Sequence, residues 1–195
     1  MKSAHDQFLA NIQRARDLVG LAANIDAQTT SILDASDLFR SALVLGVSAL
    51  DHFVHELVRI GMLEIAQGLR PATPAYSRFS VRLGNIGAPA GFAWLDAEIR
   101  ERHGWLSFQD PEKIADAVRH VSSVSLWEHI GDEVGILPTD AKARLRLIVD
   151  RRNKIAHEAD MDPTAPGARW PVSHAMADDA LDYLSCLAEA VLKGI

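Results

Sequence analysis

Residues 38–58, with the sequence LFRSALVLGVSALDHFVHELV, are the most hydrophobic stretch of the chain and decide its fold class. Apolar residues recur here every three or four positions, which is the spacing of one face of an α-helix. They surround much of the first half of the stretch, so we expect a central buried helix over about residues 34–68. Gly46 within it would permit close approach of a neighbouring helix. The most apolar run, 42–50, is about half as long as a membrane span, which favours a buried helix in a soluble protein.

Three further long helices are predicted around the central one. Helical spacing of apolar residues marks them at about residues 3–23, 139–159 and 174–192. The polar segment 24–30 is expected to connect the first two helices of the chain. Thr139 is the expected N-cap of the helix that follows it.

The middle third of the chain, about residues 70–138, is predicted to be a helical and loop-rich insertion. Prolines and glycines, Gly87 and Pro89 among them, punctuate its first part. Short helices are expected over three segments: 93–103, about 111–120, and 124–134. Asp110 is the expected cap of the second of these. Nothing alternates with period two and no repeat occurs, so the prediction is an all-α helical bundle forming one domain over residues 1–195.

The composition favours a cytoplasmic protein. The chain has 195 residues, 48% of them hydrophobic, which is enough to bury a sizeable core. The single cysteine, Cys186, cannot form an intrachain disulfide and lies in an apolar helical stretch, so we expect a small core residue in a reducing compartment. No basic segment followed by an apolar one comes after Met1, and secretion is therefore not expected.

Charge is distributed unevenly along the chain. Residues 142–154 contain six cationic side chains against Asp150 alone, a net charge of +5, whereas the whole chain has −6 and the remainder therefore −11. A basic strip on an acidic body is compatible with a small polyanion site. The alternative is a solvated helix face whose arginines complement the helix dipole.

The segment Arg151-Arg152-Asn153-Lys154-Ile155-Ala156-His157 ends the helix predicted over 139–159. At about 100° per residue, Arg152 falls in the middle of an apolar stripe, where a helix that only packs would have Leu or Ile. An unpaired buried guanidinium costs several kcal/mol, roughly, so Arg152 must meet a carboxylate, a phosphate or a wet interface. Asn153 lies on the edge of the stripe, and His157 follows it at i+4. The apolar residues of the stripe are Ala141, Leu145, Ile148, Val149, Ile155 and Ala156.

Other kinds of site find less support in the sequence. His52 and His55 could share a metal ion, but no third ligand is apparent and the zincin order is absent. Asp51 and His55, at i and i+4, could instead form a hydrogen-bonded pair. There is no Gly-x-Ser-x-Gly motif and no glycine-rich phosphate loop. We expect no metal and no cofactor. A purely structural role for the helix end, with Arg152 paired to a carboxylate, remains open.

Arg152-Asn153-x-x-x-His157 resembles the Arg-x4-6-His motif of the HEPN superfamily, in which a polar residue commonly follows the arginine. The segment 48–56, SALDHFVHE, resembles the second helix of the RiboL-PSP-like HEPN branch. The resemblance covers the order of the long helices and does not specify residues 70–138. It implies a homodimer that brings two such motifs into one cleft. It also implies a metal-independent ribonuclease, of the kind found in toxin, abortive-infection and other defence systems.

The resemblance assigns roles to individual residues. His157 would be the general acid or base, because an imidazole has an ordinary pKa of about 6.5. Arg152 would bind the scissile phosphate, and Asn153 would orient His157 or bind phosphate. Cationic neighbours would contact the RNA along the rim, and these are Arg144, Arg146, Arg151 and Lys154. Helix registers suggest Asp51 as a partner of Arg152, with His55 beside it. The alternative function is a non-catalytic HEPN module that binds a partner protein, a nucleotide or RNA in a toxin–antitoxin or defence complex.

Overall fold

The computed structural model describes residues 1–29, 34–86 and 91–195 of the chain. This part of the chain is helical, as predicted, and contains one isolated β-bridge, between Met161 and Arg169, but no strand. The α-helices are α1 (Lys2–Gln28), α2 (Ser36–Ala66), α3 (Pro74–Ser77), α4 (Ala93–His103), α5 (Pro111–Val118), α6 (Leu126–Val134), α7 (Pro138–His157) and α8 (His174–Lys193). A short 3-10 helix, η1 (Leu83–Asn85), precedes α4.

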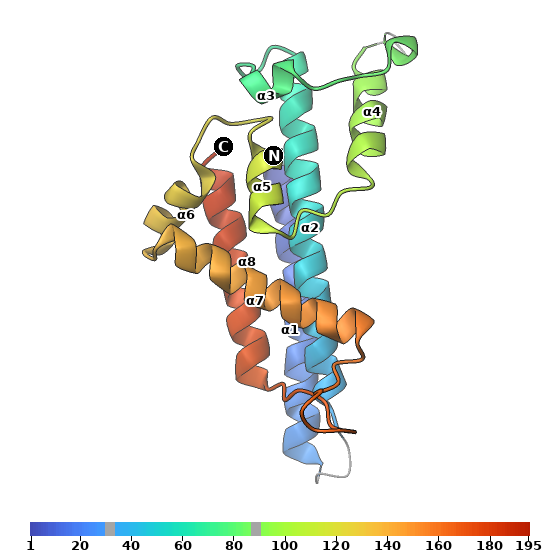
Figure 1. Cartoon of the computed structure of the whole chain (residues 1–195), viewed down its shortest axis with the longest axis vertical. Coiled ribbons are helices and arrows are strands. Elements are labelled where there is room, and N and C mark those ends of the chain that lie inside the picture. The colour runs from blue at the N-terminus through green and yellow to red at the C-terminus, as the bar shows by residue number, and fades with distance from the viewer. Residues whose placement is uncertain (30–33, 87–90) are drawn as a thin grey trace.

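The long helices form a bundle that α7 crosses. Figure 1 shows α1, α2 and α8 side by side along the long axis, with α7 lying across them. The helices of the middle third gather at the end of the bundle where both termini lie. One continuous hydrophobic cluster draws on α1, α2 and α4 to α8.

The central helix α2 supplies the middle of this cluster. Leu50, Phe53 and Leu57 are fully buried, and the ring of Phe53 lies 5.3 Å from that of Phe8 in α1. Each such side chain contributes roughly 1.5–3 kcal/mol by its burial. The close approach expected at Gly46 is present, because a Cβ atom there would lie 2.5 Å from the side chain of Leu181 in α8.

The same helix α2 is long and apolar enough to cross a bilayer, judged by length and composition. However, 56% of its most apolar window is buried inside the bundle. A core helix meets the same two criteria, so this is weak support for a membrane span.

Several predicted boundaries are confirmed and others are wrong. Helix α4 has the expected bounds, and the side chain of Asp110 caps α5 by accepting hydrogen bonds from two backbone amides. Helix α1 runs five residues beyond its predicted end, because Ile25 still packs against the core and the polar residues lie on the exposed face. Helix α7 begins at Pro138, with Leu137 at the N-cap position, so Thr139 belongs to the first turn. The expectations for Thr30, Gly87 and Pro89 lie outside the described residues.

Cys186 is exposed, not buried as expected. The buried face of α8 contains Leu184, Leu187 and Val191. Position 186 lies about 200° around the helix from Leu184 and therefore points away from the core. Because the segment is apolar in composition, the sequence did not show which face of the helix contains Cys186.

Candidate functional site

The last two turns of α7 carry the predicted site residues. Arg152 is half-buried, while Asn153 and His157 are exposed. The Nε atom of Arg152 is buried, and within residues 1–29, 34–86 and 91–195 it has no hydrogen-bond partner. The predicted apolar stripe is only partly covered, because Ala141 and Leu145 are buried whereas Ile155 is half-exposed. The end of α7 therefore presents a guanidinium, an amide and an imidazole on an incompletely covered surface.

The neighbouring arginine, Arg151, has a different environment. Its Nη2 atom donates to Oδ2 of Asp160 at 2.8 Å and to the carbonyl oxygens of Trp170 and Pro171 at 3.0 and 3.1 Å. Burial, the largest effect, lowers the pKa of Arg151, although the Asp160 carboxylate acts in the opposite direction. Of the two adjacent arginines, Arg151 therefore stabilises the fold, and the Arg152 side chain can bind a ligand.

Asp160 also binds Arg40 from the first turns of α2. The Nε atom of Arg40 donates to Oδ2 of Asp160 at 2.6 Å, and Nη2 donates to the carbonyl of Trp170 at 2.9 Å. Asp160 is 1% exposed. A buried carboxylate shared by two guanidiniums holds the end of α7 against the beginning of α2, and we call Arg40, Arg151 and Asp160 the Asp160 cluster.

The backbone directs the Asp160 carboxylate into this cluster. Ala159 and Asp160 both adopt positive φ, at 52° and 58°, which turns the chain sharply after α7. The amide of Asp160 donates to the carbonyl of Lys154 at 3.0 Å, and its own carbonyl accepts from the amide of Trp170 at 2.9 Å. The loop 158–173 is thus fastened at Asp160.

The sequence pointed to Arg152 but not to Arg40 or Asp160. Arg40 stands in the apolar stretch of α2, between Phe39 and Leu43, which are both buried. The argument applied to Arg152, that a cation in an apolar stripe needs a partner, holds equally for Arg40. Asp160 lies 120 residues away, and sequence spacing gave no indication of it.

The four cations predicted to line an RNA-binding rim are all ion-paired. Arg144 donates to Asp179 at 2.5 Å, Arg146 to both carboxylate oxygens of Glu112 at 2.6 and 2.7 Å, and Lys154 lies 2.9 Å from Asp150. Arg151 belongs to the Asp160 cluster. The first three pairs involve exposed carboxylates, and such pairs are worth roughly 0–1 kcal/mol, so those cations can exchange partners. Arg151 cannot do so without taking one of two guanidiniums away from a buried carboxylate.

Tyr183 of α8 anchors the first half of α7. Its hydroxyl donates to the carbonyl of Ala141 at 2.5 Å, and the guanidinium of Arg144 lies 4.6 Å from the centre of its ring. Burial raises the pKa of Tyr183 to about 12, against the opposing effect of Arg144. The phenol therefore stays protonated and remains a donor.

Asp51 and His55 form the expected i,i+4 pair but lie at a different place. The His55 Nε2 and Asp51 Oδ1 atoms are 3.7 Å apart. The carboxylate of Asp51 accepts hydrogen bonds from the amide of Phe108 at 2.5 Å and from the side chain of Gln109 at 3.1 Å. No contact among the described residues joins Asp51 to Arg152. Within one subunit the expected pairing is not formed, and Asp51 instead holds the α4–α5 connection.

His55 and His103 meet in an aromatic environment beside this pair. Their ring centroids are 6.3 Å apart, and each ring also contacts Phe108. Burial, the largest effect, lowers the pKa of His55 although Asp51 raises it. In the described part of the chain, no three histidine, cysteine, aspartate or glutamate side chains are grouped as metal ligands.

Comparison with protein-family models, with curated proteins and with solved structures gives no match for this chain.

Proposed function

We propose that this protein is a metal-independent endoribonuclease of the HEPN type, acting as a homodimer in a toxin or defence system. The observation that carries the proposal is the contrast between two adjacent arginines. The Nε atoms of both are buried without a partner, but Arg151 is bound through Nη2 by a buried carboxylate, whereas no atom of the half-buried Arg152 guanidinium has a partner among the described residues. A phosphate is a suitable partner for such a group, because a guanidinium binds two phosphate oxygens at once.

The chemistry follows from the residues at the end of α7. His157 acts as general acid or base on the RNA, and Arg152 binds the scissile phosphate and stabilises the charge that develops on its oxygens. The 2′-hydroxyl loses its proton as its oxygen attacks the adjacent phosphorus, and the bond to the 5′ oxygen breaks. The departing 5′ oxygen takes up a proton. The products are a 2′,3′-cyclic phosphate and a 5′-hydroxyl, and no metal ion takes part.

A second copy of the chain would complete the site. Arg152 and His157 are five residues apart and therefore about 140° apart around the helix, so one α7 directs them to different sides. Apolar residues left exposed or half-exposed on α7 include Leu147 in the middle of the helix, which is 71% exposed, and Ile155 in its last turn. A twin subunit covering this surface would bring Arg152 of one copy towards His157 of the other.

Cleavage of single-stranded RNA in the presence of EDTA tests the proposal. The wild-type protein should yield products ending in a cyclic phosphate, and His157→Ala should abolish their formation. His52→Ala is the matched control, because His52 is exposed on α2 and its side chain has no described hydrogen bond. Cleavage that persists in His157→Ala, or that requires a divalent metal, would contradict the proposal.

Expression in cells separates the enzyme from a binding module. A ribonuclease toxin should arrest growth, and His157→Ala should relieve the arrest. Wild-type protein that binds RNA or a partner but cleaves nothing and leaves growth unchanged would instead support the non-catalytic HEPN module.

A further inference from the structure

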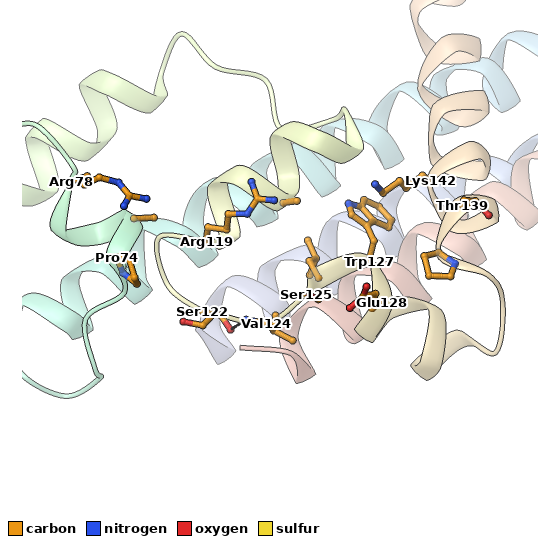
Figure 2. Close-up of a pocket in the computed structure, with 15 residues that line it drawn as sticks. Pro74, Arg78, Arg119, Ser122, Val124, Ser125, Trp127, Glu128, Thr139 and Lys142 are labelled. Carbon is orange, nitrogen blue, oxygen red and sulfur yellow. Dashed lines mark hydrogen bonds between the residues drawn. The ribbon is translucent and has the colours of Figure 1, made fainter.

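A groove of about 580 Å³ lies at the opposite end of α7 from Arg152 and His157. Its walls come from α3, the α5–α6 connection and the first turns of α6 and α7. Figure 2 shows Arg78, Arg119 and Lys142 spread along one side of it, with Ser122 and Ser125 on the other. We call this feature the α3–α7 groove. It shares no residue with the candidate site described above.

The three cations come from three separate elements. Arg78 follows α3, Arg119 follows α5, and Lys142 lies in the second turn of α7. Of the described residues that line the groove, Glu128 is the only acidic one, so this lining has a net charge of +2 in a chain of net charge −6. Like charges brought together from separate parts of a fold repel one another, and an anionic ligand would offset that repulsion.

These cations are available to a ligand. The side chain of Arg78 is exposed and has no ion pair or hydrogen bond within residues 1–29, 34–86 and 91–195. Among the residues that the structure describes, Arg119 pairs with Asp116 alone, three residues before it, and the two side chains are 64% and 68% exposed. An exposed pair of this kind contributes roughly 0–1 kcal/mol and is readily exchanged for a phosphate. Lys142 lies 3.6 Å from Glu112, which already holds Arg146.

The remaining lining favours phosphate over bases. Ser123, Ser125 and Thr139 line the groove, and the hydroxyl of Ser125 makes no capping bond at the beginning of α6. Trp127 is buried, and its Nε1 atom donates to the carbonyl of Pro111 at 2.9 Å, so its ring forms a wall and is not free to stack on a base. Spaced cations with neutral donors between them match a chain of phosphates and read no sequence.

We propose that the α3–α7 groove binds the phosphodiester backbone of an RNA strand, as a docking site separate from the place of cleavage. The proposal rests on the proposed ribonuclease function for its choice of RNA. Binding of RNA in the groove does not require cleavage. Experiments can therefore refute the binding proposal and the ribonuclease proposal separately.

The test is equilibrium binding of a fluorescently labelled single-stranded RNA to the His157→Ala variant of the 195-residue chain in EDTA. Adding Arg78→Ala and Arg119→Ala should weaken binding roughly ten- to a hundredfold, by loss of two charge-assisted contacts. The slope of log K against log salt concentration should fall by about 0.7 for each phosphate contact removed. Adding Arg14→Ala, an exposed arginine of α1 outside the groove, should change neither quantity.

Three outcomes would overturn the proposal. The first is an Arg78→Ala/Arg119→Ala protein that binds RNA as tightly, with the same salt slope, as the Arg14→Ala control. The second is displacement of the RNA by millimolar AMP or inorganic phosphate, which would assign the groove to a small phosphate ligand. The third is no RNA binding at all by the His157→Ala protein. The wild-type protein could cleave no RNA while the Arg78→Ala/Arg119→Ala variant still shows the expected loss of RNA affinity. That result would support RNA binding in the groove and refute only the proposed nuclease activity.

Discussion

The ion pair between Arg151 Nη2 and Asp160 Oδ2, at 2.8 Å, ties the last turns of α7 to the loop that follows it. Arg40 joins the same oxygen from α2 at 2.6 Å. This carboxylate takes up Arg151, whereas the adjacent Arg152 has no ion pair or hydrogen bond within the part of the chain that the structure describes. The Asp160 cluster therefore positions the candidate site without belonging to it.

Asp160→Asn should lower the free energy of unfolding by about 3–5 kcal/mol, because it removes the shared carboxylate from the buried Arg40 and the half-buried Arg151, and Arg40 keeps the exposed Asp37 at 3.3 Å. Asparagine tolerates the positive φ of this position, so the loss reports the charge and not backbone strain. Urea unfolding measures the change. Asp150→Asn is the control, since Asp150 is 60% exposed in its pair with Lys154 and its loss should cost less than about 0.5 kcal/mol. Equal losses in the two variants would refute a structural role for the cluster.

Substitutions of the two adjacent arginines should have different effects on the stability of the fold and on RNA cleavage. Arg152→Leu removes a guanidinium whose buried Nε has no described partner, so the free energy of unfolding should stay equal to wild type or rise by up to ~1 kcal/mol. Cleavage of RNA should fall at least about a hundredfold with loss of the charge that binds the phosphate.

Arg151→Leu should instead lower the free energy of unfolding by roughly 2–4 kcal/mol, because the buried Asp160 carboxylate loses one of its two guanidiniums and keeps Arg40. Urea unfolding and initial cleavage rates of both variants give the comparison. A strongly destabilised Arg152→Leu would mean that this side chain is a structural element.

Much of the helical arrangement was predictable from the sequence, because local signals determined it. The bounds of α4 and the cap at Asp110 follow from short-range chemistry, and the central position of α2 follows from its apolar surface. The partners of charged residues were not predictable. Arg146 meets Glu112 and Arg144 meets Asp179 across separate helices, which left a predicted row of free cations largely neutralised. Pairing over such sequence distances depends on how the helices pack, and spacing along one helix does not encode it.

Stability should fall as the pH is lowered from 6.5 towards 4. Burial, the largest effect, lowers the pKa of His103 to about 4, with smaller contributions in the same direction from His120 and His55. Below pH 6.5 the unfolded chain binds a proton at this histidine that the folded chain does not, so unfolding becomes easier until about pH 4. The total loss is on the order of 3 kcal/mol.

Urea unfolding at a series of pH values measures this dependence. His103→Phe removes the titrating group while keeping an aromatic ring among Phe79 and Phe108. It should flatten the profile between pH 6.5 and 4, leaving the smaller contribution of His55, whose pKa is also lowered by burial. An unchanged profile in His103→Phe would assign the dependence to other groups.

Cys186 should react with a thiol reagent in the folded protein, because its side chain is exposed on α8. Titration with Ellman's reagent without denaturant should release one equivalent of chromophore per chain, and Cys186→Ser should release none. Cys186→Ser should change the free energy of unfolding by no more than about 0.5 kcal/mol. Reaction only after addition of urea would mean that the thiol is covered in solution.

Helix α7 runs unbroken from Pro138 to His157, with one end at the α3–α7 groove and the other at the candidate site. Lys142 and Arg152 are ten residues apart, and at a rise of about 1.5 Å per residue they are separated by about 15 Å along the helix axis. A rigid helix of this length would set the distance between the two sites for any RNA strand that is bound at both ends of α7. Shortening the oligonucleotide step by step should therefore bring an abrupt drop in affinity at the length that no longer bridges the two ends.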